Sequence, residues 1–148
     1  MSDPDPVPSV ERTGSGRFRV VLATDLSRIG VVVETVAACA LPTPSASRQT
    51  HFRLRTILGE AIVNAMVYGN QGEPSRLVTI EVELHDDRLV IAVSDEGVGF
   101  DPAAIAPPTV DDRLGATRGR GLFLIRRLAD HVAFNDRGNT IWMTLPRS

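Results

Sequence analysis

Residues 59–70 read GEAIVNAMVYGN and belong to a segment with the periodicity of an amphipathic helix. At about 100° per residue, one arc of this helix is wholly apolar. Glu60 and Asn64 stand one turn apart at the border of that arc, where their side chains can point along the rim of the core. The apolar arc consists of Leu54, Ile57, Leu58, Ala61, Ile62 and Ala65.

A carboxylate and an amide at the edge of a core need polar partners. An ionised carboxylate is costly to bury alone, and a buried amide needs its hydrogen bonds satisfied. Two interpretations of the pair are open from these residues. In one, Glu60 pairs with Arg53 or Arg55 while Asn64 caps a loop. In the other, both side chains point into a ligand cavity between the helix and a sheet.

The rest of the chain alternates strand-like and helical segments. Their order predicts an α+β fold, a two-layer sandwich in which a mixed, mostly antiparallel sheet carries its helices on one face. Residues 1–16 are acidic and rich in Pro and Gly, which predicts a disordered tail before a single domain at 17–148. The expected elements are strands at 17–23, 76–84, 88–94, 132–136 and 140–145, and helices from Asp25 or Ser27 to Leu41, at 48–67 and at 120–132.

Composition and charge argue against several classes of function. The 148 residues carry a net charge of -2, which disfavours nucleic acid as a direct partner. All 16 basic residues are Arg, so a nucleotide site here must hold phosphates without a lysine. The single cysteine, Cys39, excludes an internal disulfide and a cysteine-based zinc cluster. We expect a cytoplasmic protein without membrane contact, because no segment approaches the roughly 20 apolar residues of a membrane span and the amino terminus has no signal-peptide pattern.

A glycine-rich segment, SDEGVGFDP (94–102), follows the more apolar of the two central strands. Asp95, at the strand end, can accept hydrogen bonds from an exocyclic amine. Gly97 and Gly99 permit positive φ or close approach of the backbone to a flat ligand. Taken alone, the segment is equally compatible with a glycine-rich turn. It opens a stretch at 95–118 without predicted regular structure, and stretches of that length are usually functional.

A second glycine-rich segment, TRGRGLFLI (117–125), leads into the last helix. Gly119 and Gly121 leave backbone N–H groups free for phosphate oxygens at the positive end of the helix dipole, and Arg118 and Arg120 add positive charge. A flexible helix start with solvated arginines explains the same residues. Neither glycine pair completes GxGxxG, which disfavours a dinucleotide-binding fold.

The three segments together resemble the N, G1 and G2 boxes of the GHKL ATPase superfamily, whose histidine-kinase-like ATPase domain has the Bergerat fold. They occur in the order of that family: a helix with Glu and Asn, a strand followed by DxGxG, a loop, and GxG followed by a helix. The resemblance spans residues 17–146. Within it, GEAIVNAMVYGN and RGRGLFLIRRLADHVAF are similar to the single-domain anti-sigma-factor serine/threonine kinases of bacteria.

This resemblance implies a role for each matching residue in binding ATP and Mg²⁺. Asn64 would ligate Mg²⁺, and Glu60 would act as general base toward the attacking hydroxyl. Residues 101–118 would form a lid over the nucleotide. The implied nucleotide contacts are Asp95, Gly97, Gly99 and Thr140 at the adenine, and Arg118, Gly119, Arg120 and Gly121 at the phosphates.

The resemblance also implies partners. The substrate would be a STAS-type anti-sigma-factor antagonist, and the same protein would sequester an RNA polymerase sigma factor in an alternative complex. A homodimer is implied as well. Tyr68 departs from the family pattern, since relatives commonly carry His there. The resemblance therefore does not determine the partner specificity of the surface around this residue.

Two other functions compete with this interpretation. In the catalytic domain of a histidine kinase, His51 would be the phosphate acceptor, but it lies only nine residues before Glu60 on the same predicted helix. In a non-catalytic ATP-binding module, the protein would control a partner by sequestration alone. The presence of Glu60 disfavours that alternative, because a pure binder does not require a base.

Overall fold

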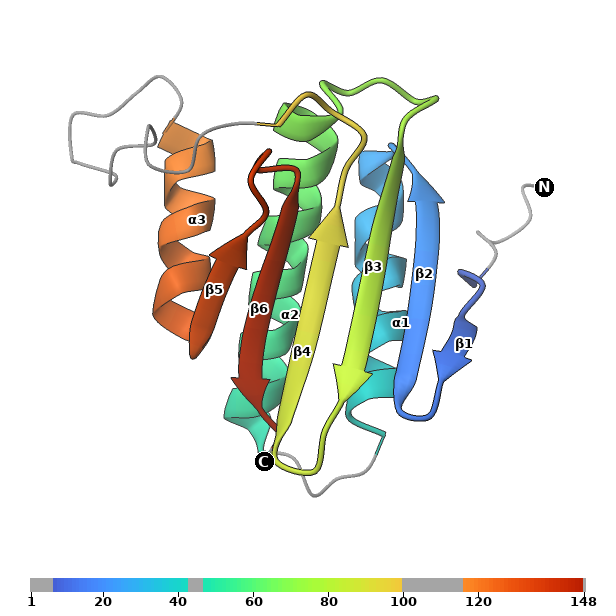
Figure 1. Ribbon diagram of the computed structural model, residues 1–148, viewed down its shortest axis with the longest axis vertical. Coiled ribbons are helices and arrows are strands. Elements are labelled where there is room, and N and C mark those ends of the chain that lie inside the picture. The colour runs from blue at the N-terminus through green and yellow to red at the C-terminus, as the bar shows by residue number, and fades with distance from the viewer. Residues whose placement is uncertain (1–6, 43–46, 100–115, 148) are drawn as a thin grey trace.

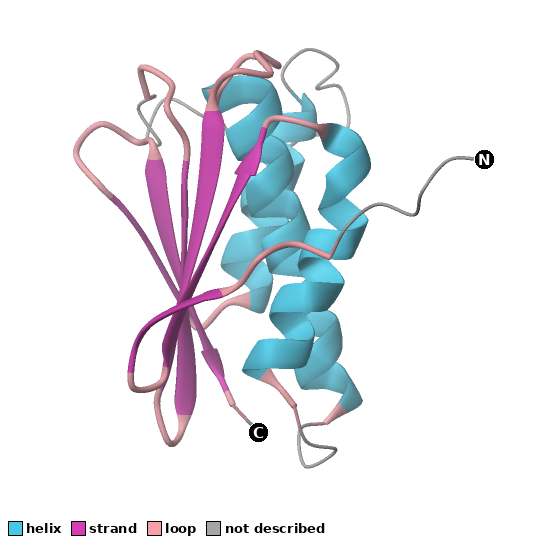
Figure 2. Ribbon diagram, turned by 90° about the vertical axis from the view of Figure 1, so that its right-hand side faces the viewer, coloured by secondary structure: helices cyan, strands magenta, loops and turns pink. Residues whose placement is uncertain are grey.

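The computed structural model describes residues 7–42, 47–99 and 116–147, with the side chains of 116–118 left out. It has two layers, a six-stranded sheet and α-helices that cover one of its faces (Figure 2). This confirms the predicted α+β sandwich. In the described part of the chain, no helix combines the length and the apolar character needed to cross a membrane.

The sheet order is β1-β2-β3-β4-β6-β5, and each of the five neighbouring pairs is antiparallel (Figure 1). The elements are β1 (Glu11–Gly14), β2 (Arg17–Ala23), the 3₁₀ turn η1 (Leu26–Arg28), α1 (Ile29–Ala40), α2 (Arg48–Val63), the π-helical segment η2 (Asn64–Gly69), β3 (Leu77–Leu84), β4 (Arg88–Ser94), α3 (Ala116–Leu128), β5 (His131–Phe134) and β6 (Thr140–Pro146).

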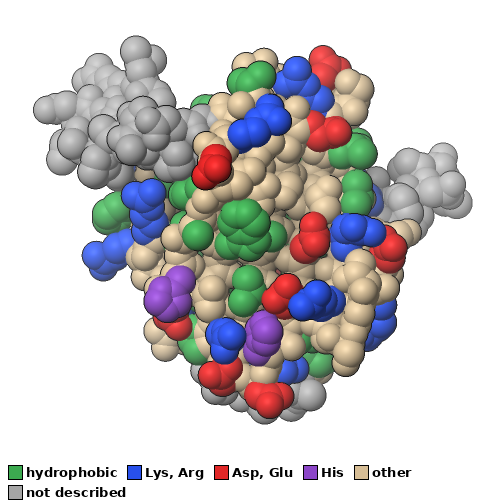
Figure 3. All heavy atoms as spheres, in the orientation of Figure 1, with side chains coloured by type: hydrophobic (Ala, Val, Ile, Leu, Met, Phe, Trp, Pro, Cys, Tyr) green, Lys and Arg blue, Asp and Glu red, His purple; other side chains and the backbone are tan. Residues whose placement is uncertain are grey.

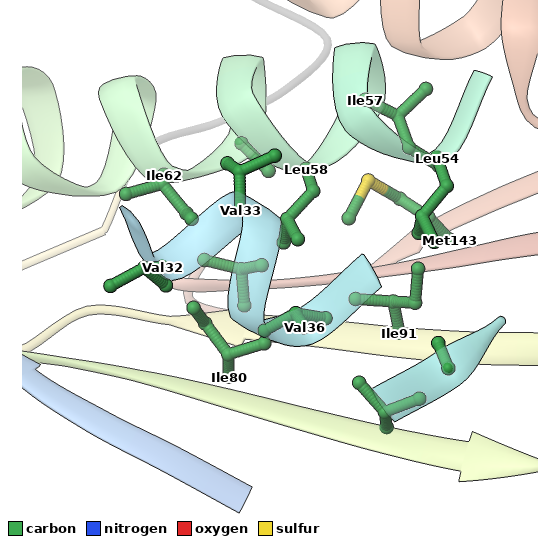
Figure 4. Packing of buried hydrophobic residues seen from close by; sticks show 14 of the residues in the cluster. Val32, Val33, Val36, Leu54, Ile57, Leu58, Ile62, Ile80, Ile91 and Met143 are labelled. Carbon is green, nitrogen blue, oxygen red and sulfur yellow. The ribbon is translucent and has the colours of Figure 1, made fainter. Parts of the chain in front are cut away.

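The core lies between the sheet and the helices (Figure 4). Side chains on a strand alternate between its two faces, so every second residue of the central strands points at the helices. The apolar arc predicted for α2 is buried throughout. The sheet contributes Val78, Ile80 and Val82 from β3, Leu89, Ile91 and Val93 from β4, and Ile141, Met143 and Leu145 from β6.

Strand β1 corrects the expectation of a disordered tail through residue 16. Gly16 adopts a φ of 69°, which glycine tolerates readily, so the GSG sequence makes a hairpin turn instead. Arg19 then lies opposite Glu11 and donates to its Oε2 at 2.9 Å. Pairing with β2 stabilises β1 at the edge of the sheet. The composition of residues 1–16 alone does not predict this stabilisation, because it comes from another segment.

The last helix begins and ends earlier than predicted. α3 runs from Ala116 to Leu128 instead of 120–132. Its end is set by the sheet, because Asp130 N already donates to Thr144 O at 2.8 Å and β5 starts at His131. Of the predicted lid at 101–118, residues 101–115 lie outside the described residues and 116–118 form the start of α3.

Adjacent valines in β2 test the placement of the core. Val20 is 1% exposed and Val21 is 48% exposed. We expect Val20→Ala to lower the free energy of unfolding by about 2 kcal/mol through lost burial and a residual cavity. The control Val21→Ala should change it by less than about 0.5 kcal/mol. Urea unfolding measures both, and equal losses would contradict the assignment of the buried face.

Candidate functional site

A pocket lies between the helix layer and the sheet, at the end of the molecule where β4 stops. The first part of α3, the end of β4 and the junction of α2 with η2 lie close together there (Figure 1). The structure brings Asn64 and Asp95 to this one pocket, although they lie 31 positions apart in the chain. The lining residues are Ala61, Asn64, Ala65, Val93, Asp95, Leu122, Phe134, Gly138, Asn139 and Ile141.

The helix that carries the Glu–Asn pair changes its winding at Asn64. The sequence predicts an uninterrupted helix at 48–67, whereas α2 ends at Val63 and η2 is π-helical. The hydrogen bond from Asn70 N to Ala65 O, at 2.7 Å, closes one such wider turn. π-helical turns occur frequently at functional sites. Periodicity does not predict this one, because the apolar spacing of the segment fits an ordinary helix equally well.

Gly121 of α3 packs directly against the pair. A methyl group at Gly121 would lie 2.9 Å from Glu60 Oε2 and 3.4 Å from Asn64 Nδ2. The buried Nδ2 of Asn64 has no hydrogen-bond partner among the described residues. An unsatisfied buried amide is costly. The side chain is therefore available to a polar ligand at the start of α3.

The purely structural interpretation of Glu60 is not supported, because both arginines proposed for it have other partners. Arg53 donates from Nε to Leu128 O at 2.7 Å and from Nη2 to Asp130 at 3.1 Å. Arg55 donates to Glu34 of α1 at 2.8 Å, and this hydrogen bond lowers the pKa of the Glu34 carboxyl. Within the described residues, Glu60 has no hydrogen bond or ion pair.

Asp95 is held at the other side of the pocket by backbone groups. Its own N–H donates to Asn139 O at 2.9 Å, and Gly97 N donates to Asp95 Oδ1 at 2.8 Å. A methyl group at Gly97 would collide with Gly69 O, and one at Gly99, where φ is 88°, would collide with Arg137 O. These two glycines serve close packing of the chain against itself, and neither lines the pocket.

The predicted phosphate-binding residues lie in the first turns of α3. Gly119 and Gly121 are buried and Arg120 is exposed, while the side chain of Arg118 is outside the described part. Both glycines lie within the helix, whereas the sequence placed them where a loop enters it. The first N–H groups of a helix have no partner inside the helix, so the start of α3 presents donors to the same end of the molecule as Asn64.

Thr140 is not brought to the pocket. Its hydroxyl lies 2.9 Å from Ser94 Oγ, and both residues line a groove on the open face of the sheet. That face carries charged side chains of both signs (Figure 3). The neighbour Asn139 lines the pocket instead and was not predicted. Strand alternation could have indicated this, since the apolar Ile141 and Met143 must face the helices.

The chain matches the histidine kinase-like ATPase domain family over residues 21–145. It belongs to this family, which confirms the resemblance seen in the three sequence segments and implies the use of ATP.

Two curated relatives are named as a serine-protein kinase and an anti-sigma factor. The chain is 35% identical over 98 residues to serine-protein kinase RsbW of Listeria innocua, covering 62% of each chain. It is 29% identical over 101 residues to anti-sigma F factor of Oceanobacillus iheyensis, covering 62% of this chain and 66% of the relative. The chain thus spans a little under two thirds of the length of these curated relatives.

Two glycines on facing helices test the packing at the pair. A methyl group at Gly59 of α2 would meet nothing within 4 Å. We expect Gly59→Ala to raise the free energy of unfolding by about 0.4–1 kcal/mol, as a helical Gly→Ala change without strain does. Gly121→Ala should show no such gain, because the new methyl group displaces the Glu60 carboxylate. Thermal unfolding compares the two variants, and equal stabilisation would show that Glu60 and Gly121 are not in contact.

Proposed function

We propose that this chain is a Mg-ATP-dependent serine/threonine protein kinase and anti-sigma factor. It would phosphorylate a STAS-type anti-sigma-factor antagonist and sequester a sigma factor. The observation that carries the proposal is the contact of Gly121 with Glu60 and Asn64, at a pocket that Asp95 lines from the strand side. The Asn64 amide and Asp95 line the pocket, whereas Glu60 and Gly121 are not among its lining residues and meet Asn64 beside it. Among the described residues, Asn64 Nδ2 has no hydrogen-bond partner and Glu60 has no arginine partner.

The strand side of the pocket suits an adenine base. Val93, Ile141 and Ala65 provide apolar walls for a flat ring. The Asp95 carboxylate is an acceptor for the exocyclic amino group. Asp95 N donates to Asn139 O, and Asp95 Oδ1 accepts from Gly97 N, so both the backbone and the side chain of Asp95 are held. Asn139 is a second polar group at this side. A guanine, which carries a carbonyl oxygen in place of that amino group, would face a carboxylate that repels it.

The helix side suits phosphates and a magnesium ion. The Asn64 amide is buried with one terminal atom unpaired, and turning the amide over would place its oxygen there. Mg²⁺ prefers oxygen ligands and retains several waters, so one amide oxygen together with phosphate oxygens is a sufficient set. When bound, the ion would neutralise phosphate charge. The start of α3 would bind phosphate oxygens through backbone N–H groups, with Arg118, Gly119 and Arg120 beside them.

Glu60 would act as the general base. It lies one turn before Asn64 and against Gly121. Arg53 and Arg55 donate their hydrogen bonds to other groups, so neither pairs with Glu60. Its carboxylate would orient the hydroxyl of a serine or threonine substrate and take up its proton. A base in this role contributes roughly 10²–10⁴-fold to the rate.

The partners are proposed from the relatives. The names serine-protein kinase and anti-sigma F factor support a protein hydroxyl as acceptor and a sigma factor as target. A STAS-type antagonist as the substrate and a homodimer as the working form follow from the sequence resemblance. Tyr68 lies in η2, four residues after Asn64, and would influence which partner docks.

Two substitutions separate binding from transfer. We expect Asn64→Ala to abolish most of the Mg-dependent affinity for ATP, because the metal ligand is lost. Glu60→Gln should bind ATP normally and transfer phosphate about 10²–10⁴-fold more slowly, because the amide cannot take up a proton. Glu73→Gln, at an exposed glutamate outside the pocket, is the matched control. Calorimetry with and without Mg²⁺ measures binding, and γ-labelled ATP with STAS-domain proteins of the same genome measures transfer.

Three outcomes would contradict parts of this function. Equal transfer by the wild type and Glu60→Gln would remove the base assignment. Unchanged affinity of Asn64→Ala would remove the metal assignment. A wild type that binds ATP and its partner but never labels it would establish the non-catalytic module instead.

A further inference from the structure

Asn70 is the most deeply buried polar residue in the described part of the chain. Its exposed fraction is 0%, and it directly follows η2. It does not line the pocket. Burial of an amide is unfavourable unless hydrogen bonds replace its water contacts. The hydrogen-bond partners of Asn70 therefore indicate which segments its side chain fixes in place.

The Asn70 side chain joins three separate segments. Its Nδ2 donates to Thr24 Oγ1 at 2.9 Å, just after β2, and to Leu77 O at 3.0 Å, at the start of β3. Its Oδ1 accepts from Glu96 N at 2.8 Å, in the turn after β4. Both amide hydrogens and the oxygen are used, so the side chain is fixed in one orientation.

The bond to Glu96 N acts on Asp95. That N–H belongs to the peptide that joins Asp95 to Glu96, so Asn70 holds the backbone immediately after the Asp95 side chain. The peptide before Asp95 is held from the other side, where Asp95 N donates to Asn139 O at 2.9 Å. Asp95 is thus fixed between two anchors, and Asn70 is the one that lies in the protein interior.

The residue before Asn70 touches the carboxylate itself. A methyl group at Gly69 would collide with the Asp95 carboxyl group, and one at Gly97 would collide with Gly69 O. The end of η2 therefore packs on the turn after β4 without an intervening side chain. A shift of Asn70 would move the surface against which the carboxylate rests.

We propose that Asn70 is a positioning residue for base recognition. By holding the Asp95–Glu96 peptide, it sets the direction of the Asp95 carboxylate and thereby the preference of the pocket for a base with an exocyclic amino group. The inference rests on the proposed binding of ATP. Asn70 acts only through Asp95 and does not touch the nucleotide.

The test compares ATP with inosine triphosphate, which has a carbonyl oxygen in place of the adenine amino group. The wild type should prefer ATP. In Asn70→Ala we expect this preference to fall by about fivefold to tenfold, the effect of one misdirected hydrogen bond. The control Thr24→Val removes a hydroxyl from the same network but leaves the bond from Glu96 to Asn70, so it should keep the preference. Calorimetry measures each affinity.

Stability is measured in parallel by thermal unfolding, because both substitutions remove buried hydrogen bonds. Asn70→Ser, with a side chain too short to span to Glu96 N, replaces the alanine variant if that one does not fold. An unchanged preference in a folded Asn70 variant would overturn the proposal, and so would an equal loss in Thr24→Val. Failure of the wild type to bind either nucleotide would instead overturn the proposed function.

Discussion

The docking of α3 on α2 is the constraint on which the site depends. Near its start, Gly121 lets the helix approach the side chains of Glu60 and Asn64. At its other end, Leu128 O accepts a hydrogen bond from Arg53 Nε at 2.7 Å. A cation at the carboxyl end of a helix is favourable, so Arg53 also stabilises the docked helix through its dipole. The end of α3 proposed to bind phosphates is thereby held against the helix that carries the proposed metal ligand and base.

The side of the pocket proposed to bind the base depends on contacts with the backbone instead. Asp95 is fixed by Asn139 O and Gly97 N, and the following peptide by Asn70. The absence of a side chain at Gly69 brings η2 into contact with this turn. Groups held in this way lose little further freedom when a ligand binds, which favours affinity. The two sides of the pocket meet in η2, since Asn64 begins that segment and Gly69 ends it.

Much of the fold could be predicted from hydrophobic periodicity. The alternation in β3 and β4 and the apolar arc of α2 each have a single arrangement that buries their apolar residues, and the structure has that arrangement. Strand β1 could not be predicted in this way, because its pairing with β2 outweighs a composition typical of disorder. Periodicity does not predict the π-helical winding of η2 either, because this winding changes the hydrogen bonding without changing which residues are apolar.

The sequence by itself determined the chemistry that is available: a carboxylate and an amide one turn apart, a strand-end aspartate, and a chain in which arginine supplies every fixed positive charge. Tertiary structure decided which of these groups meet. It placed Gly121 on Glu60, directed Arg53 and Arg55 elsewhere, and turned Thr140 to the open face so that Asn139 lines the pocket. The reason is physical, since residue types fix what a group can bind, while only the packing of distant segments fixes the distance and direction between groups.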